Sequence, residues 1–172
     1  MAFDPSNMDH IVMGNMTMGA QVTFDGGLAW TGVAGLGAGD DIDVFSAVIS
    51  PADPNVVYLM VRNEAELKAG RPSEGRHIHK STDGGRHFTS VAEQDNRITL
   101  PNGPVMAADP KDSGTVYFIY GTYYQGYGTD IYKYDSHSQN VSVAHNSYHR
   151  IDSIAFHPRA PGLLYFGVDK ER

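Results

Sequence analysis

The segment at residues 81–88 (STDGGRHF) decides the fold that this sequence predicts. Its defining positions are Ser81, Asp83, Gly85 and Phe88. An aspartate side chain can accept hydrogen bonds from backbone N–H groups within its own turn, and glycine adopts the positive φ values that tight turns need. An aromatic residue just after the turn buries against the sheet and holds the two strands together. The segment therefore predicts a tightly fixed β-hairpin.

The same pattern occurs upstream at residues 23–30 (TFDGGLAW). The matching hydroxyl, aspartate, glycine and aromatic positions are Thr23, Asp25, Gly27 and Trp30. A third, degenerate copy surrounds Tyr134, Asp135 and Ser138. A lone Asp-Gly pair predicts no more than a generic hairpin, but its repetition indicates a repeat fold.

A second motif, a proline turn followed by an apolar and aromatic strand, alternates with the first. Its copies occupy residues 2–12, 49–59, 108–118 and 155–166. The spacing between successive prolines is 46, 59 and 48 residues, for Pro5, Pro51, Pro110 and Pro158. That spacing suits a four-stranded propeller blade of about 40–50 residues. The sequence therefore predicts an all-β fold, a β-propeller segment of about three and a half four-stranded blades.

The expected blades cover about residues 1–33, 45–91 and 104–144, with a half-blade at 151–172, all within a single segment 1–172. Such a segment leaves apolar blade faces and a strand edge uncovered. We therefore expect either a homodimer that closes the ring or the remainder of a longer chain, and the abrupt start favours the longer chain. Residues 63–69 (NEAELKA) have helix-forming composition but are few, which predicts a loop insertion with one helical turn.

Composition restricts the classes of partner. The formal net charge is −7 and no run of Lys or Arg is long enough to follow a phosphate backbone, so we expect no nucleic-acid and no membrane partner. No apolar run approaches the roughly 20 residues that span a bilayer. Cysteine is absent, which excludes disulfides and thiolate metal sites. The sequence indicates no cofactor.

The turn pattern S-x-D-x-G-x-x-[WF] resembles the Asp-box, or BNR repeat, of sialidases, xyloglucanase-like glycosidases and sortilin-type propellers. The resemblance implies the propeller fold and a secreted or extracytoplasmic location. The Arg-Ile-Pro signature of sialidases is missing, whereas residues 154–169 (IAFHPRAPGLLYFGVD) are more similar to xyloglucanase-like sequences. The paired catalytic acids of those enzymes cannot be assigned to positions here, so the resemblance specifies the fold better than the function.

Candidate binding residues fall in the loops that join the second strand to the third and one blade to the next. Residues 121–130 (GTYYQGYGTD) place Tyr123, Tyr124 and Tyr127 among glycines. Tyrosine rings can stack on the apolar faces of sugars while their hydroxyls form hydrogen bonds, which predicts a substrate-binding platform for carbohydrate. The alternative is that these rings pack over a neighbouring blade or contact a protein.

Acidic residues mark the second candidate loop, residues 37–44 (GAGDDIDV), which contains Asp40, Asp41 and Asp43. Two carboxylates in one cleft can divide into the acid and base of a glycosidase, or hold a hard cation. Neighbours in sequence seldom form the catalytic pair, because the two carboxyl groups must stand about 5–9.5 Å apart. We therefore expect a solvated acidic turn, with these aspartates as the catalytic candidates if the protein is an enzyme.

Histidines provide the remaining candidates, because His77 and His79 alternate along an expected strand and share one face, with His87 on the following strand. A zinc site is conceivable, but no further ligand is evident, and polar residues on an exposed or partly covered strand face are the preferred interpretation, with no metal.

Taken together, the sequence predicts a scaffold that binds glycan or protein without a complete catalytic site, the alternative being part of a glycoside hydrolase.

Overall fold

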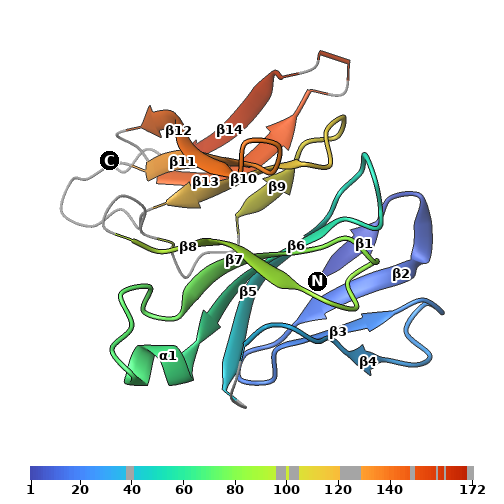
Figure 1. The fold of residues 1–172 in the computed structure, drawn as a ribbon. Helices are drawn as coiled ribbons and strands as arrows, with labels where there is room; N and C mark the ends of the chain where they lie inside the picture. Colours follow the sequence, from blue (N-terminus) through green and yellow to red (C-terminus); the bar gives the residue numbers. More distant parts are fainter. Residues whose placement is uncertain are drawn as a thin grey trace.

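The chain folds into a series of antiparallel sheets. The computed structural model describes residues 1–37, 41–95, 100, 105–120, 129–147, 150–157, 159–160 and 162–169. Figure 1 shows the sheets side by side in chain order, from the first sheet to the C-terminal hairpin. The described residues contain three four-stranded sheets, one two-stranded sheet and a single short helix. The predicted all-β character is therefore confirmed.

Each four-stranded sheet runs in simple sequence order, every strand pairing with the next. The first sheet consists of β1 (Ala2–Asp4), β2 (Asn7–Gly14), β3 (Ala20–Thr23) and β4 (Thr31–Gly32). The second consists of β5 (Ile42–Ile49), β6 (Val57–Asn63), β7 (Arg76–Ser81) and β8 (Thr89–Glu93). The third consists of β9 (Met106–Ala108), β10 (Thr115–Tyr120), β11 (Thr129–Asp135) and β12 (Asn140–Ser147), and the C-terminal hairpin consists of β13 (Arg150–Phe156) and β14 (Leu164–Asp169).

Apolar residues fill the boundaries between consecutive sheets. Strand β6 shows how, because its side chains alternate between two faces. Leu59 belongs to the cluster shared with the first sheet, and Met60 belongs to the cluster shared with the third sheet. A third cluster, which includes Ile131 and Ile151, joins the third sheet to the C-terminal hairpin. The sheets therefore pack face to face in a row, as the blades of a propeller do.

The first strands of successive sheets also contact one another, β1 with β5, β5 with β9 and β9 with β13. This arrangement places the first strand of each sheet on the inner side of the row and the fourth strand on the outer side. Helix α1 (Glu64–Lys68) lies in the β6–β7 connection, as the composition of that segment predicts. The side chain of Asn63 caps it by accepting from the backbone N–H groups of Ala65 and Glu66.

The β3–β4 and β7–β8 turns have matching hydrogen bonds. In the β7–β8 turn, Ser81 Oγ donates to Asp83 Oδ1 at 2.7 Å and accepts from the N–H of Gly85 at 3.0 Å. Thr23 and Asp25 form the equivalent bond at 2.6 Å, and Gly27 N–H donates to Thr23 Oγ1 at 3.1 Å. The closing aromatic residues differ, because Phe88 is buried while Trp30 is half-buried and donates from Nε1 to the carbonyl of Gly27 at 3.1 Å.

Candidate functional site

A cavity of about 390 Å³ lies beside helix α1, at the end of the second sheet that carries the β6–β7 connection. We refer to it as the α1 cavity. Its lining combines charged and polar side chains from α1 and the loop after it, from β7, and from the end of β8: Glu66, Arg71, Pro72, Ser73, His77, Glu93, Gln94 and Asp95. Small-molecule pockets are usually apolar with a few polar groups, so this cavity is more polar than the usual ligand pocket.

His77 connects three elements at the wall of this cavity. Its Nε2 lies 2.8 Å from Glu66 Oε2, on α1, and its Nδ1 lies 3.1 Å from Ser90 Oγ, on β8. Ser73 Oγ donates to the same Glu66 oxygen at 3.3 Å. The imidazole is buried, whereas Ser90 is exposed on the outer strand of the sheet. The arrangement places a hydroxyl, an imidazole and a carboxylate in one hydrogen-bonded row.

The carboxyl group of Glu66 is held in its ionised form. Burial tends to raise its pKa, but the hydrogen bond from His77, the charge of His77 and the hydrogen bond from Ser73 outweigh burial, and the pKa is lowered. An ionised carboxylate can only accept hydrogen bonds. It follows that His77 donates to Glu66 from Nε2, and that in the neutral form of the ring Nδ1 accepts from the Ser90 hydroxyl.

His79 stands next to His77 on the same face of β7, with the two ring centroids 5.6 Å apart in an edge-on arrangement. Burial, followed by the charge of His77, lowers the pKa of His79 to about 4. Among the residues described, its Nδ1 is a buried atom without a hydrogen-bond partner. The prediction of an exposed or partly covered histidine face is therefore wrong, because the neighbouring elements bury both rings.

His87 does not lie on a strand opposite these two histidines. It falls in the β7–β8 turn, before β8 begins at Thr89, and its side chain is exposed. Its Nδ1 lies 2.6 Å from Asp83 Oδ2, so the ring supports the turn. The prediction that His87 lies on the strand after the turn is therefore wrong. In the part of the chain that the structure describes, no three acidic or histidine side chains are grouped so as to hold a metal ion.

The acidic candidates separate in the structure. Asp43 lies within β5 and not in a solvated turn; it is buried and accepts from the backbone N–H of Thr17 at 2.8 Å. Asp41 precedes the strand and forms an ion pair with Lys68 of α1, at 3.3 Å between Nζ and Oδ2. Asp40 lies outside the described residues, as do Tyr123, Tyr124 and Tyr127. Their predicted roles stay predictions.

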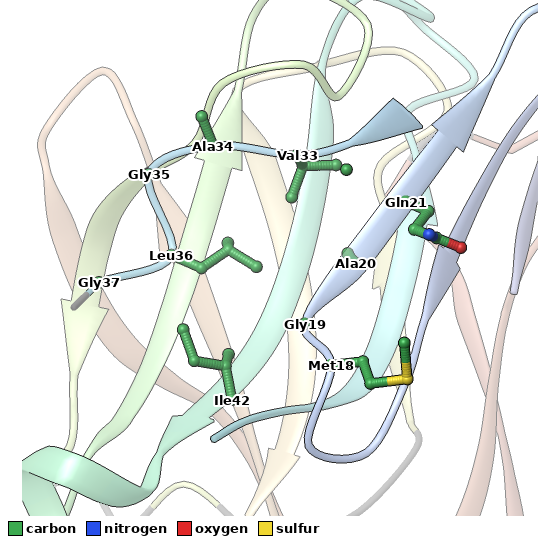
Figure 2. A pocket seen from close by; sticks show the side chains of 11 residues that line it. Met18, Gly19, Ala20, Gln21, Val33, Ala34, Gly35, Leu36, Gly37 and Ile42 are labelled. Atoms are coloured by element: carbon green, nitrogen blue, oxygen red, sulfur yellow. The ribbon is translucent and has the colours of Figure 1, made fainter. Parts of the chain in front are cut away.

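A second cavity, of about 430 Å³, lies between the first two sheets. Figure 2 shows its wall, which residues 33–37 form as they cross from β4 toward β5. The lining is largely glycine and apolar, with Leu36 and Ile42 on one side and Met18 on the other. Met18 and its neighbour Met16 are 73% and 54% exposed. Met18 lines the cavity and Met16 lies two positions earlier in the chain; we refer to these two exposed methionines as the apolar rim.

Glu66 and Ser90 were not candidates at the level of sequence, because neither belongs to a recognisable motif. Glu66 sits in a segment whose composition indicates only a helical turn, and Ser90 stands on an ordinary edge strand. The alternation of His77 and His79 was the one available signal. Their partners depend on how α1 folds back over β7, which no local pattern specifies.

No family model matches the sequence. The dispase autolysis-inducing protein of Streptomyces mobaraensis is 42% identical over 133 residues, which cover 77% of this chain and 36% of that protein. The crystal structure of an ancestral GH74 enzyme matches 99% of this chain and 24% of its own, with a TM-score of 0.66 and 20% identity. The GH74 xyloglucanase of Xanthomonas campestris matches 96% of this chain and 27% of its own, with a TM-score of 0.50 and 17% identity.

The chain therefore spans about a third of the length of its curated relative and about a quarter of each enzyme. At these identities the two enzyme structures bear on the fold alone. Within the described residues no helix is both long and apolar enough to cross a membrane. The all-β sheets, their strand order and the match to both GH74 enzymes identify the chain as a β-propeller segment of about three and a half blades.

Proposed function

We propose that this chain is part of an Asp-box propeller that binds a protein partner, and that the partner is a protease of the kind named by its relative. The observation that carries the proposal is the 42% identity over 133 residues to the dispase autolysis-inducing protein. That identity is about twice the 20% shared with the ancestral GH74 enzyme. The turns at Asp25 and Asp83 fit the Asp-box pattern, which stabilises a propeller without taking part in chemistry.

The apolar rim of the second cavity supports a protein partner. Met16 and Met18 are exposed beside a cavity whose lining is largely glycine and apolar. Methionine side chains are flexible and polarisable, and they are over-used at surfaces that contact proteins. We therefore place the first test of partner binding on this rim.

The carboxylates with described surroundings give less support to a glycosidase. A general acid in such an enzyme needs a raised pKa. The pKa of Glu66 is lowered, as set out above, and the pKa of Asp4 is also lowered, because its hydrogen bonds from Ser6, His10 and Asn7 outweigh burial. Asp43 is engaged by the Thr17 amide. These groups suit structural roles in a scaffold.

The test measures binding and self-digestion of dispase together. The protein is immobilised, dispase is passed over it in a biolayer experiment, and the loss of intact dispase is followed on gels with and without the protein. We expect binding, and we expect Met16→Ser/Met18→Ser to weaken it at least about tenfold. Met8→Ser, exposed on β2 away from this cavity, is the matched control. Absence of binding at micromolar concentrations would reject the proposal.

A second candidate is part of a glycoside hydrolase, and the fold match to two GH74 enzymes favours it. In that case one of Asp40, Asp41 and Asp43 acts as acid or base, and Tyr123, Tyr124 and Tyr127 hold the glycan. Incubation with xyloglucan and a reducing-end assay decides between the two candidates. Turnover of xyloglucan that is lost in Asp43→Asn would favour the hydrolase. Glycan binding that occurs without turnover, and is lost in Tyr124→Ala, would favour a non-catalytic lectin-like scaffold.

A further inference from the structure

We propose that Ser90, His77 and Glu66 form a nucleophilic relay, in which the Ser90 hydroxyl attacks activated carboxylic esters. The proposal does not depend on the partner proposed above. Nucleophile, base and orienting carboxylate within hydrogen-bond reach of one another are the structural signature of covalent acyl transfer. The two distances here are 3.1 Å from Ser90 Oγ to His77 Nδ1 and 2.8 Å from His77 Nε2 to Glu66 Oε2.

The direction of the two hydrogen bonds gives each residue its role. Glu66 is ionised and can only accept, so the proton on the His77 ring resides on Nε2. In the neutral ring Nδ1 then carries a lone pair, which accepts the hydrogen of Ser90. The imidazole uses its nitrogens in the opposite sense to the serine proteases, but the relay of base and orienting carboxylate is the same.

A β-bulge places the nucleophile. Ile78 pairs with Ala92 and His79 pairs with Ser90, so Val91 is an extra residue in β8. Bulges change the direction of a side chain and are common beside active sites. Because of this shift, Ser90 pairs with His79 and its hydroxyl also reaches His77. The His79 ring lies beside His77 in a T-shaped arrangement, with the ring planes at 68°.

Exposure also fits the roles of the three groups. The base is buried, with 9% of its side chain accessible, while the carboxylate is partly accessible at 34%. Ser90 is exposed on β8, the outer strand of the second sheet, where an ester can approach without entering a closed pocket. The relay is therefore protected at the base and open at the nucleophile.

The reaction is a hydrolysis through an acyl-serine. Ser90 Oγ bonds to the carbonyl carbon of the ester while its proton moves to His77 Nδ1, and Glu66 stabilises the imidazolium through Nε2–H. The ester bond then breaks, and the leaving group departs as an alcohol or phenol with the proton from Nδ1. Water attacks the acyl group, gives a proton to Nδ1, and releases the carboxylic acid as Ser90 recovers its hydrogen.

The relay should react with esters that have good leaving groups, such as aryl acetates. Amides and alkyl esters need strong additional stabilisation of the oxyanion, which commonly contributes several kcal/mol. A base and its orienting carboxylate contribute through the removal of the serine proton, typically by about 10²–10⁴-fold. We therefore expect acylation by p-nitrophenyl acetate and labelling by a fluorophosphonate probe.

The test combines labelling with kinetics. Intact protein is incubated with the fluorophosphonate, and peptide mass spectrometry locates the adduct, which we expect on Ser90. Ser90→Ala should abolish labelling and the release of p-nitrophenol, and His77→Gln should slow both by about 100-fold. Thr89→Ala, which removes the adjacent exposed hydroxyl on β8, is the matched control and should react like the unmodified protein.

Glu66 is a positioning residue, so its variant needs a readout other than rate alone. Glu66→Gln retains the size of the side chain but removes the charge that stabilises the imidazolium. The inflection of labelling rate with pH should therefore move to lower pH, with thermal unfolding used to confirm that the variant is folded. An adduct on another residue, equal rates for Ser90→Ala and the unmodified protein, or an unchanged inflection in Glu66→Gln would each overturn the relay.

Discussion

The imidazole of His10, on the first sheet, donates from Nε2 to the carbonyl oxygen of Gly84, in the β7–β8 turn of the second sheet, at 2.9 Å. Its Nδ1 lies 3.2 Å from Asp4 Oδ2, and its ring stacks on Phe24 with the centroids 4.7 Å apart. The side chain is buried. One residue therefore connects the β1–β2 turn, the β3–β4 turn and the neighbouring sheet.

Replacing this connection should destabilise the fold. His10→Ala removes the donor to the Gly84 carbonyl and the partner of Asp4 Oδ2, and each such loss costs about 1–3 kcal/mol. We expect the free energy of unfolding, measured by urea titration, to fall by about 2–3 kcal/mol. His137→Ala is the control, because the His137 side chain is 73% exposed in the β11–β12 turn, and it should change stability by less than about 0.5 kcal/mol. Equal losses in both variants would contradict this role of His10.

Gly35 should tolerate no side chain. Its φ is +88°, and a Cβ there would stand 2.0 Å from the carbonyl oxygen of Phe88, a backbone atom that cannot turn aside. Gly35→Ala should therefore reduce the free energy of unfolding by about 3 kcal/mol or more. Gly32→Ala, at the end of β4 just before this connection, is the matched control, since Gly32 has open space around its Cβ position, and thermal unfolding should show little change. A mild effect at Gly35 would mean that residues 33–37 can move away from Phe88.

The propeller fold could be predicted from the sequence because its turns are local. Asp83 and the glycines after it determine a hairpin within eight residues, whatever the rest of the chain does. Contacts between sheets are different, since His10 and Gly84 are 74 residues apart and nothing near either of them indicates the pairing. The same reason explains why Ser90 and Glu66 were missed, and why Asp43 was expected in a loop although β5 buries it.

His79 should make stability depend on pH. Its pKa in the folded protein is lowered to about 4, first by burial and then by His77, whereas an unfolded histidine titrates near about 6.5. Between these values the unfolded chain binds more protons, so stability is fully present above pH of about 6.5 and declines as pH falls toward about 4. The total loss is about 3 kcal/mol. His79→Met should flatten this part of the profile of unfolding free energy against pH; an unchanged slope would show that another group causes it.

Asp83 should matter more than an aspartate with a single turn contact. Its carboxylate accepts from Ser81 Oγ and from the N–H groups of Arg86 and His87. Asp83→Ala should cost about 2 kcal/mol, measured by urea titration at neutral pH. Asp109→Ala, which removes one bond from the N–H of Lys111, is the comparison and should cost less than half as much.

Acid should remove the difference between Asp83→Ala and the unmodified protein. Burial opposes ionisation of Asp83, but the hydrogen bonds from His87, Ser81 and Arg86 prevail, and its pKa lies far below the usual range. The stabilisation is therefore present above about pH 3.9, the pKa of an unfolded aspartate, and is lost as pH falls through the lowered value of the folded state. A difference that shrinks on raising the pH instead would contradict the assignment.

The path from β4 to β5 has a mechanical consequence. Ala34 donates its N–H to the Arg86 carbonyl and accepts from the N–H of Phe88, both at 2.9 Å, so the linker itself forms a parallel bridge to the turn of the next sheet. The two sheets cannot separate independently, because their separation would break these backbone hydrogen bonds between the linker and the second sheet. Their slowest amides should exchange with deuterium at one common rate. Residues inserted at α1 should leave this bridge intact. Even one residue inserted at Ala34 would shift the linker out of register with Arg86 and Phe88 and break the bridge.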